Sequence, residues 1–255
     1  RNASLSDVEK YTHNISFVGS LYTEKCPYDK VKNLSPKISG YLHGIMKAQE
    51  KIYGYYFVEE LLSDELVDEF VKNYDGYYLA GEEDLLTKKR TLAQFYIGNK
   101  ITAMERVDTF KYLSEKFEVD IYTASDTKEI PKLKNHGTIM THTQMPIVFN
   151  KSTINLNPTS KPIRSGIPLR IFDLLACEGF VLCNYQSDLL NEFLQGEELD
   201  IYSSIEELEE KIRYYLSHTD VCREIAHNGY EKVSKRHTYP LRLEQMFRLG
   251  EHRRR

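Results

Sequence analysis

Residues 155–173 bring together residue types that bind phosphate groups. A predicted buried strand ends in polar residues at Asn157, and a helix is predicted to begin at Pro168, since proline is favoured in a helix's first turn. The loop between them and the helix start carry three cations, which are Lys161, Arg164 and Arg170. Gly166 keeps the approach to the helix open, where the helix dipole would stabilise an anion by about 0.3–1 kcal/mol. The stretch therefore predicts a phosphate site.

Arg170 and Asp173 are three positions apart, so they share one face of the predicted helix. A guanidinium pairs with phosphate oxygens, and a carboxylate accepts hydrogen bonds from two hydroxyl groups. The two side chains together suit a ligand that carries both a diphosphate and a ribose diol. The alternative is a local ion pair on the helix surface, worth less than about 1 kcal/mol.

A second candidate site follows the first predicted strand, residues 14–18. The strand runs directly into Gly19 and Ser20. A residue without a side chain lets backbone N–H groups approach a phosphate at the carboxyl end of a parallel strand. An ordinary glycine turn explains the same feature equally well.

The rest of the chain alternates between apolar strands and amphipathic helices. After the first strand, a Tyr-rich acidic segment with helical spacing extends from Ser35 to about Gly98 and predicts a helical insertion. The helix that completes this interrupted βα unit is expected at the capping box formed by Thr102 and Glu105. Further strands are predicted at 119–122, 136–140, 153–156, 180–183 and 199–202, with helices at 147–151 (or a turn), 168–176, 189–194, from Ser204 onward and at 220–235.

Strands separated by single helices imply a parallel sheet with right-handed crossovers. The predicted fold is therefore α/β, a Rossmann-like parallel sheet with an all-helical insertion after the first strand. We expect a polar N-terminal segment at 1–11, one α/β domain at 12–250 that contains the insertion at 35–99, and a basic tail at 251–255. The final residues, Arg253 to Arg255, are expected to be a solvated tail.

The composition limits the classes of function. The 255 residues have a net charge of -4, which gives no general electrostatic surface for nucleic acid. No segment approaches the roughly 20 apolar residues of a membrane span, and the first residues lack a signal peptide's apolar stretch, so a cytoplasmic location is expected. The chain contains no GxSxG, Walker A or GxGxxG motif, which disfavours serine hydrolases, NTPases and dehydrogenases.

The cysteines and histidines do not predict a metal site. The four cysteines, Cys26, Cys177, Cys183 and Cys222, are scattered and lack zinc spacing. His136, His142 and His237 are expected in loops or at element ends, and they lack the i, i+4 spacing with a third ligand. No bound metal is expected.

Several phrases, in order, resemble spore-maturation CgeB-like glycosyltransferases, chiefly their C-terminal domain. The phrases are 17–22, 40–42, 48–49, Glu105-Arg106, 152–157, 165–173, 176–180, 225–229 and 237–239, and they cover nearly the whole chain. The resemblance implies a GT-B fold, a nucleotide-diphosphate-sugar donor, with UDP favoured over GDP, and sugar transfer to an unknown acceptor without a metal.

The resemblance also implies site roles. Asp173 matches the position of the acidic residue that holds the donor ribose, and Gly19 and Ser20 match the turn that contacts donor phosphates. Many relatives have Arg after that glycine and Lys six residues after it; this chain keeps Lys25 but has Ser20 in place of the Arg. Arg170 is therefore the better phosphate cation, and Asn157, Arg164 and Gly166 complete the predicted donor site.

A GT-B enzyme has two Rossmann-like domains, and the pattern here predicts one. The N-terminal, acceptor-binding half and its catalytic base are therefore expected outside these residues, and no catalytic residue is assigned. Two alternatives stay open. One is a GT-B-fold sugar-nucleotide epimerase, which would need its own pair of carboxylates near the sugar. The other is a non-catalytic docking module that uses the Tyr-rich insertion.

Overall fold

The computed structural model describes residues 4–74 and 87–252. Within these residues, six strands form one parallel sheet in the order β3-β2-β1-β4-β5-β6. The strands are β1 (Ile15–Val18), β2 (Asp120–Tyr122), β3 (Lys134–Asn135), β4 (Ile154–Asn157), β5 (Val181–Asn184) and β6 (Asp200–Tyr202). Strand β1 pairs with β2 on one side and with β4 on the other. This is the strand order of a Rossmann-like fold, so the predicted fold class is confirmed.

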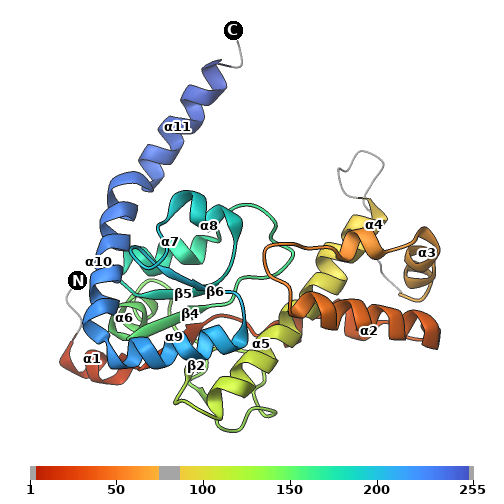
Figure 1. The fold of residues 1–255 in the computed structure, drawn as a ribbon, viewed down its shortest axis with the longest axis horizontal. Helices are drawn as coiled ribbons and strands as arrows, with labels where there is room; N and C mark the ends of the chain where they lie inside the picture. The colour runs from red at the N-terminus through yellow and green to blue at the C-terminus, as the bar shows by residue number, and fades with distance from the viewer. Residues whose placement is uncertain (1–3, 75–86, 253–255) are drawn as a thin grey trace.

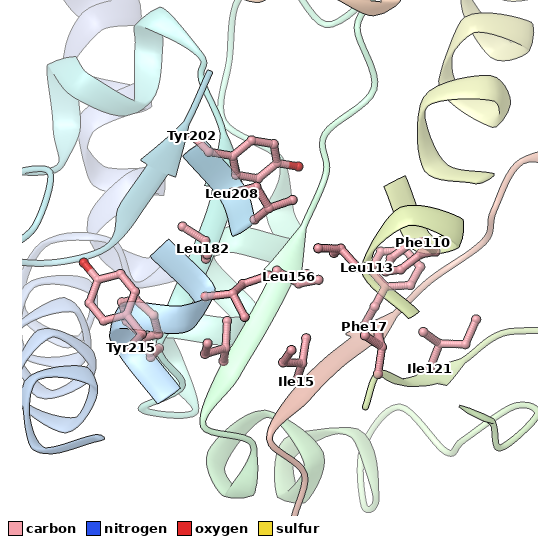
Figure 2. Close-up of a cluster of buried hydrophobic side chains, with 14 of the residues drawn as sticks. Ile15, Phe17, Phe110, Leu113, Ile121, Leu156, Leu182, Tyr202, Leu208 and Tyr215 are labelled. Atoms are coloured by element: carbon pink, nitrogen blue, oxygen red, sulfur yellow. The ribbon is translucent and has the colours of Figure 1, made fainter. Parts of the chain in front are cut away.

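Helices cover both faces of the sheet (Figure 1). On one face, α5 (Gly98–Ser114) and α9 (Ile205–Ser217) pack against the strands through Phe110, Leu113 and Leu208, as Figure 2 shows. On the other face lie α6 (Met145–Lys151), α7 (Leu169–Ala176) and α8 (Ser187–Glu192). Successive residues of a strand point to opposite faces, so Leu182 belongs to the first core and its neighbours Val181 and Cys183 to the second. Buried apolar runs in the strands are typical of a sheet covered on both faces.

The insertion between β1 and α5 is helical and has its own core. Short 3₁₀ turns η1 (Thr23–Lys25) and η2 (Pro27–Lys30) lead into α2 (Pro36–Glu50), η3 (Val58–Leu61) and α3 (Asp64–Lys72). After the undescribed residues 75–86, α4 (Lys88–Thr91) and the π-helical turn η4 (Leu92–Ile97) run into α5. The buried side chains of this second core include Leu42, Phe70 and Ile97. In Figure 1 the insertion projects to one side of the sheet.

The capping box predicted at Thr102 is wrong. The helix has already begun by Lys88, and Thr102 lies inside α5, where its hydroxyl donates to the carbonyl of Gly98 at 2.8 Å. A threonine within an established helix bonds back to the preceding turn instead of capping a new one. The helix predicted from Ser204 onward is confirmed, and the Ser204 hydroxyl caps it by accepting from the amide of Glu207 at 3.0 Å.

The strand predicted at 136–140 is also misplaced. The observed strand is β3, and the amide of His136 still donates to the Ile121 carbonyl at 2.9 Å. Gly137 then adopts a φ of +74°, in the left-handed region, which ends the extended conformation. The other predicted strands agree with the structure within one or two residues.

Both ends of the chain are more regular than predicted. The expected polar segment at 1–11 contains α1 (Leu5–Tyr11), and α10 (Thr219–Arg236) is followed by a further helix, α11 (Tyr239–His252), that extends away from the sheet (Figure 1). The tail at Arg253 to Arg255 lies outside the described residues. None of the helices in the described part is both long and apolar enough to cross a membrane.

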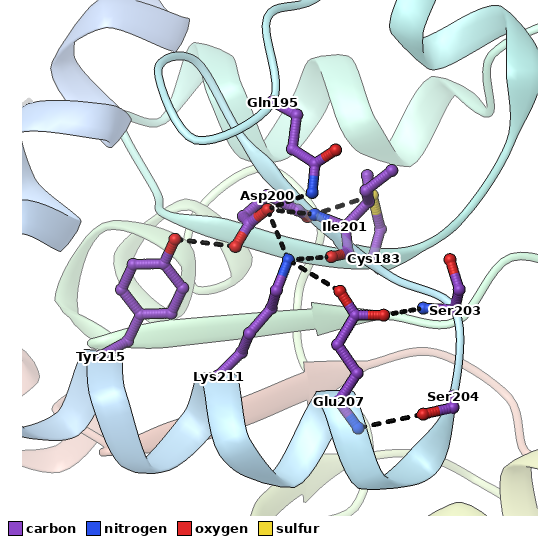
Figure 3. Close-up of polar contacts among 9 residues, drawn as sticks. All are labelled: Cys183, Gln195, Asp200, Ile201, Ser203, Ser204, Glu207, Lys211 and Tyr215. Atoms are coloured by element: carbon purple, nitrogen blue, oxygen red, sulfur yellow. Dashed lines mark hydrogen bonds and ion pairs between the residues drawn. The ribbon is translucent and has the colours of Figure 1, made fainter.

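A polar network joins β6 to α9 at the edge of the sheet. The carboxylate of Asp200 accepts from Lys211 at 2.9 Å, from Tyr215 at 2.8 Å and from Gln195 at 3.1 Å (Figure 3). Asp200 is buried, and a buried carboxylate is retained only when it is well hydrogen-bonded. This network fixes α9 against the sheet and needs no ligand to explain it.

Candidate functional site

The strand order reverses direction between β1 and β4. Ligands of open α/β sheets bind outside the carboxyl ends of the strands at such a switch point. Here the two carboxyl ends lead into Gly19 and Pro158. The residues that follow these two strands therefore form the candidate site.

Arg106 holds the two loops at the switch point together. From α5, its guanidinium donates to the carbonyl oxygens of Ser20 and Pro158, each at 2.5 Å. The guanidinium also lies over the rings of Phe17 and Tyr22, 5.4 and 4.9 Å from their centroids. Its hydrogen-bond partners are neutral carbonyls, so its positive charge is not cancelled by direct contact with a carboxylate. The sequence alone does not predict a binding role for Arg106, because its partners are backbone carbonyls, which any residue type supplies.

The loop after β1 has fewer groups available to bind a phosphate than the sequence predicts. The Gly19 amide donates to Tyr122 at 3.1 Å and continues the sheet, so it is not available to a ligand. The Ser20 hydroxyl bonds to Glu24 at 2.6 Å and accepts from the Tyr22 amide. Burial raises the pKa of Glu24, but hydrogen bonds from Ser20 and Ser125 outweigh it and lower that pKa. An ionised carboxylate therefore borders this loop and opposes a nearby anion.

Lys25 is exposed, and no ion pair or hydrogen bond of its ammonium is present among the described residues. Its ammonium sits over the ring of Tyr22, 5.3 Å from the centroid. A cation above an exposed aromatic ring contributes about 0.5–1 kcal/mol and does not fix a ligand site.

The loop after β4 is rigidly held. Asn157 is buried and donates to Thr159 at 3.1 Å. The backbone amide and carbonyl of Thr159 both bond to the side-chain amide of Asn184, at 2.7 and 2.9 Å. Asn157 therefore stabilises the conformation of the loop, and its side-chain amide already donates a hydrogen bond within the protein.

Lys161 is buried beneath the insertion. Its ammonium lies 3.4 Å from the Glu105 carboxylate, donates to the Ile52 carbonyl at 3.2 Å and lies 3.1 Å from the centroid of Tyr53. Burial raises the pKa of Glu105 and lowers that of Lys161, and the attraction between the two opposes both shifts. Lys161 is thus a structural cation, and it joins the loop after β4 to α5 and to the insertion.

Arg164 also faces the insertion. Its guanidinium pairs with Glu59 of η3 at 3.0 Å. Both Lys161 and Arg164 line a cavity of about 110 Å³ between residues 52–56 and the carboxyl ends of β4 and β5. Small-molecule sites usually measure about 300–1,000 Å³. The cavity is therefore large enough only for part of a nucleotide sugar.

The α7 N-terminus remains the best anion site of those predicted. Pro168 is the residue before the helix and supplies no side-chain cap, so the first backbone amides of α7 have no such partner. Gly166 has a φ of +88°, and its amide donates to Asp188 at 2.5 Å. That carboxylate occupies the Gly166 amide, and the Ile171 amide donates to the Pro168 carbonyl at 3.0 Å. The Leu169 and Arg170 amides are therefore the ones left for a ligand.

Arg170 and Asp173 lie side by side on α7, as predicted. Their charged atoms are 3.5 Å apart, and Asp173 is half exposed. The Arg170 guanidinium also contacts the Met145 sulfur at 2.7 Å and lies over the Phe149 ring of α6. The local ion pair considered above is therefore formed in the structure, and both side chains retain exposed surface for a ligand.

Asp173 and Gly166 also line a wide apolar groove of about 1,120 Å³. Its opposite wall is formed by α10 and α11, with Val233, Leu243 and Met246. The predicted site residues thus divide into three groups. Gly19, Ser20 and Asn157 lie at the switch point, Lys25 lies at the start of the insertion with Arg164 packed against a later part of it, and Gly166, Arg170 and Asp173 lie at α7.

Comparison with known families gives one match. The sequence model of the glycosyl transferase-like family matches residues 103–248, from within α5 to within α11. Strand β1 and the helical insertion precede the matched region. No curated protein matches the sequence.

Similar solved structures are bacterial glycosyltransferases. TarM matches with 11% identity and a TM-score of 0.45, over 56% of this chain and 31% of its own. The C-terminal domain of LpcC, a glycosyl transferase group 1 family protein from Francisella tularensis, matches with 15% identity and a TM-score of 0.42, over 52% and 77%. A variant of S. aureus TarM, in complex with fondaparinux, α-GlcNAc-glycerol and UDP, matches with 9% identity and a TM-score of 0.46, over 76% and 45%.

Proposed function

The chain belongs to the glycosyl transferase-like family, and on that premise we propose that it binds a nucleotide-diphosphate-sugar donor at the carboxyl ends of β1 and β4. The observation that carries the proposal is the Arg106 guanidinium, which holds the Ser20 and Pro158 carbonyls together where the strand order reverses. The guanidinium thus supplies a positive charge, and holds two loops together, at the position where open α/β sheets bind ligands.

The α7 N-terminus supplies the diphosphate contacts in this proposal. Its first amides lack a side-chain cap, and Arg170 lies within its first turn. Arg170 turns from Met145 and Asp173 toward the phosphates, and Asp173 accepts from the ribose hydroxyls. Both movements are side-chain rotations on an otherwise rigid helix.

In the proposed reaction, the bond between the anomeric carbon and the donor phosphate oxygen breaks, and the nucleoside diphosphate leaves with the electron pair. Backbone amides and the Arg170 guanidinium stabilise the negative charge that develops on the leaving oxygen. The acceptor hydroxyl forms the new bond and loses its proton to a base that we place outside this domain. The role proposed for the described residues is thus donor binding and leaving-group stabilisation.

We propose UDP as the preferred nucleotide, ahead of GDP. The TarM variant was solved with UDP, which makes UDP the first ligand to test here. Calorimetric titration of the chain with UDP, GDP, UMP and uridine tests the proposal directly. UDP is expected to bind more tightly than UMP and uridine, because the diphosphate makes the charged contacts.

The same titration separates the alternatives. A docking module would bind none of the four ligands. An epimerase would interconvert two UDP-sugars without an acceptor, which chromatography of the nucleotide sugars detects. Equal affinity for uridine and UDP would contradict diphosphate binding at α7.

A further inference from the structure

Three potential metal ligands meet at the β2–β3 edge of the sheet, although they come from separate segments. His13 lies between α1 and β1, Asp120 begins β2, and His136 follows β3. His13 Nδ1 lies 3.4 Å from Asp120 Oδ2, and His136 Nε2 lies 2.7 Å from Asp120 Oδ1. One ligand atom from each residue falls within 4.8 Å of the others.

The parallel register brings these residues together. Ser16 pairs with Asp120, and Asp120 pairs with Lys134. Residues two apart on a strand share a face, so His136 lies on the Asp120 face, beside Tyr122. The Tyr122 and His136 rings stack with centroids 5.0 Å apart. The His13 and Asp120 side chains are only 7% and 5% exposed, whereas His136 is 40% exposed and opens the cluster to solvent.

We propose that His13, Asp120 and His136 form a binding site for a divalent transition-metal ion, with zinc as the first candidate. Two imidazoles and one carboxylate are a common ligand set for zinc, and a water molecule completes the tetrahedron. Ligand atoms about 2.0–2.2 Å from zinc stand roughly 3.3–3.5 Å apart at tetrahedral angles. His13 and His136 approach different oxygens of Asp120, Oδ2 at 3.4 Å and Oδ1 at 2.7 Å, so binding of one ion through a single carboxylate oxygen requires side-chain rotation within the cluster.

Tyr122 orients the more buried of the two histidines, His13. Its hydroxyl lies 2.7 Å from His13 Nε2. In the tautomer with the proton on Nε2, this N–H donates a hydrogen bond to the Tyr122 hydroxyl and the Nδ1 lone pair faces Asp120. Such outer hydrogen bonds commonly fix the orientation of a metal-binding histidine.

The site is separate from the proposed donor site. His13 and Asp120 lie at the amino ends of β1 and β2, and His136 follows the edge strand β3, which β2 separates from β1. Gly19 and Pro158 instead follow the carboxyl ends of β1 and β4. A bound ion there tethers the segment before β1 to the β2–β3 edge. We therefore assign it a structural role, and its binding is expected to stabilise the fold by mass action.

The experiment uses the whole chain after removal of metal by a chelator. Zinc chloride is titrated in, and the bound metal is measured by equilibrium dialysis with elemental analysis, alongside the thermal unfolding midpoint. One zinc per chain and a midpoint that rises with zinc are expected, whereas magnesium, which prefers oxygen ligands, leaves the midpoint unchanged. Cobalt(II) is expected to give visible absorption bands that zinc abolishes by displacement.

Variants locate the ion. His136→Gln is expected to abolish stoichiometric zinc binding and the cobalt bands while leaving the metal-free midpoint nearly unchanged, because His136 is partly exposed. Tyr122→Phe keeps the ring and is expected to weaken zinc binding about 10–100-fold. His43→Gln, an exposed histidine on α2, is the matched control and is expected to bind zinc normally.

Two results would contradict the proposed zinc site. Wild-type chain that binds no stoichiometric zinc and shows no zinc-dependent midpoint would overturn the proposal and leave the cluster as a hydrogen-bonded network around Asp120. Zinc binding that survives in His136→Gln would place the ion elsewhere, and the proposal would fail as well.

Discussion

The ammonium of Lys161 lies 3.4 Å from the carboxylate of Glu105, and both side chains are almost completely buried, at 4% and 3% exposed. Neither Glu105 oxygen has a hydrogen-bond partner of acceptable geometry among the described residues, so its charge is compensated chiefly by Lys161. The pair joins the loop after β4 to α5 beneath the insertion. Lys161 is one of the three cations that the sequence predicts near a phosphate, but in the structure it stabilises the fold.

We predict that Lys161→Met destabilises the chain by about 3–5 kcal/mol, because it leaves Glu105 buried without its partner. Adding Glu105→Gln to that variant is expected to recover part of the loss. Urea unfolding of the two single variants and the double variant measures this coupling. Lys235→Met, which removes an exposed pair with Glu231, is the control and should leave unfolding nearly unchanged. Additive losses in the double variant would show that the two buried charges are not coupled.

Arg106→Lys is predicted to weaken both stability and nucleotide binding. A lysine keeps the charge but lacks the planar fork that reaches the Ser20 and Pro158 carbonyls together. The lost hydrogen bonds are expected to lower the free energy of unfolding by about 1–3 kcal/mol. Chemical unfolding and UDP titration measure the two effects, with Arg223→Lys on the exposed side of α10 as control. Unchanged UDP affinity with reduced stability would confine Arg106 to a structural role.

Asp173→Ala is predicted to reduce UDP affinity by about 1–3 kcal/mol through loss of charged hydrogen bonds to the ribose hydroxyls. The side chain is half exposed, so the variant is expected to fold normally. Calorimetry with UDP and with 2′,3′-dideoxy-UDP measures the effect, since the dideoxy ligand should not distinguish the variant from wild type. Glu224→Ala, an exposed carboxylate on α10, is the control. Normal UDP affinity in a folded Asp173→Ala protein would show that Asp173 forms only the ion pair with Arg170 and does not bind the ribose.

Arg170→Lys is predicted to weaken the binding of UDP but not the binding of uridine. UDP affinity is expected to fall by about 1–3 kcal/mol, because lysine cannot make the forked contact with the diphosphate. Uridine affinity is expected to stay nearly constant, so uridine is the internal control in the same calorimetric series. Equal losses for both ligands would place Arg170 away from the phosphates.

His237 makes the stability depend on pH. Its ring packs between Phe172 and Phe193, with centroids 5.3 and 5.5 Å away, and its side chain is 2% exposed. Burial lowers its pKa from 6.5, and nearby Arg242, Lys232 and Arg236 lower it further, against the attraction of Glu192. The folded chain therefore binds this proton less readily than the unfolded chain.

The stability from neutral His237 is fully present above about pH 6.5 and is lost as the pH falls through the lowered folded pKa. His237→Phe keeps an aromatic ring in place and is expected to flatten this part of the profile of unfolding free energy against pH. Urea unfolding between pH 5 and pH 8 measures it, with His142→Gln at an exposed turn as control. A His237→Phe profile parallel to wild type would assign the pH dependence to other groups.

The sequence by itself determined the alternation of strands and helices, the helical nature of the insertion and the helix that starts at Ser204. These features depend on local periodicity and on bonds between neighbouring residues, which the order of side chains encodes directly. It also placed Arg170 and Asp173 on one helix face, because their spacing alone decides it. The strand end at Gly137 was missed, since the φ of a glycine is set by its surroundings.

Only the tertiary structure decided which groups meet across the chain. Lys161 and Arg164 are close in sequence to Arg170, yet they pair with the distant residues Glu105 and Glu59, whereas Arg170 pairs with Asp173 on its own helix. Arg106 reaches the carbonyls of two distant loops because β1 and β4 are neighbours in the sheet. The pairing of β1, β2 and β3 brings His13, Asp120 and His136 together. Such contacts depend on how distant segments pack, and local spacing carries no information about that packing.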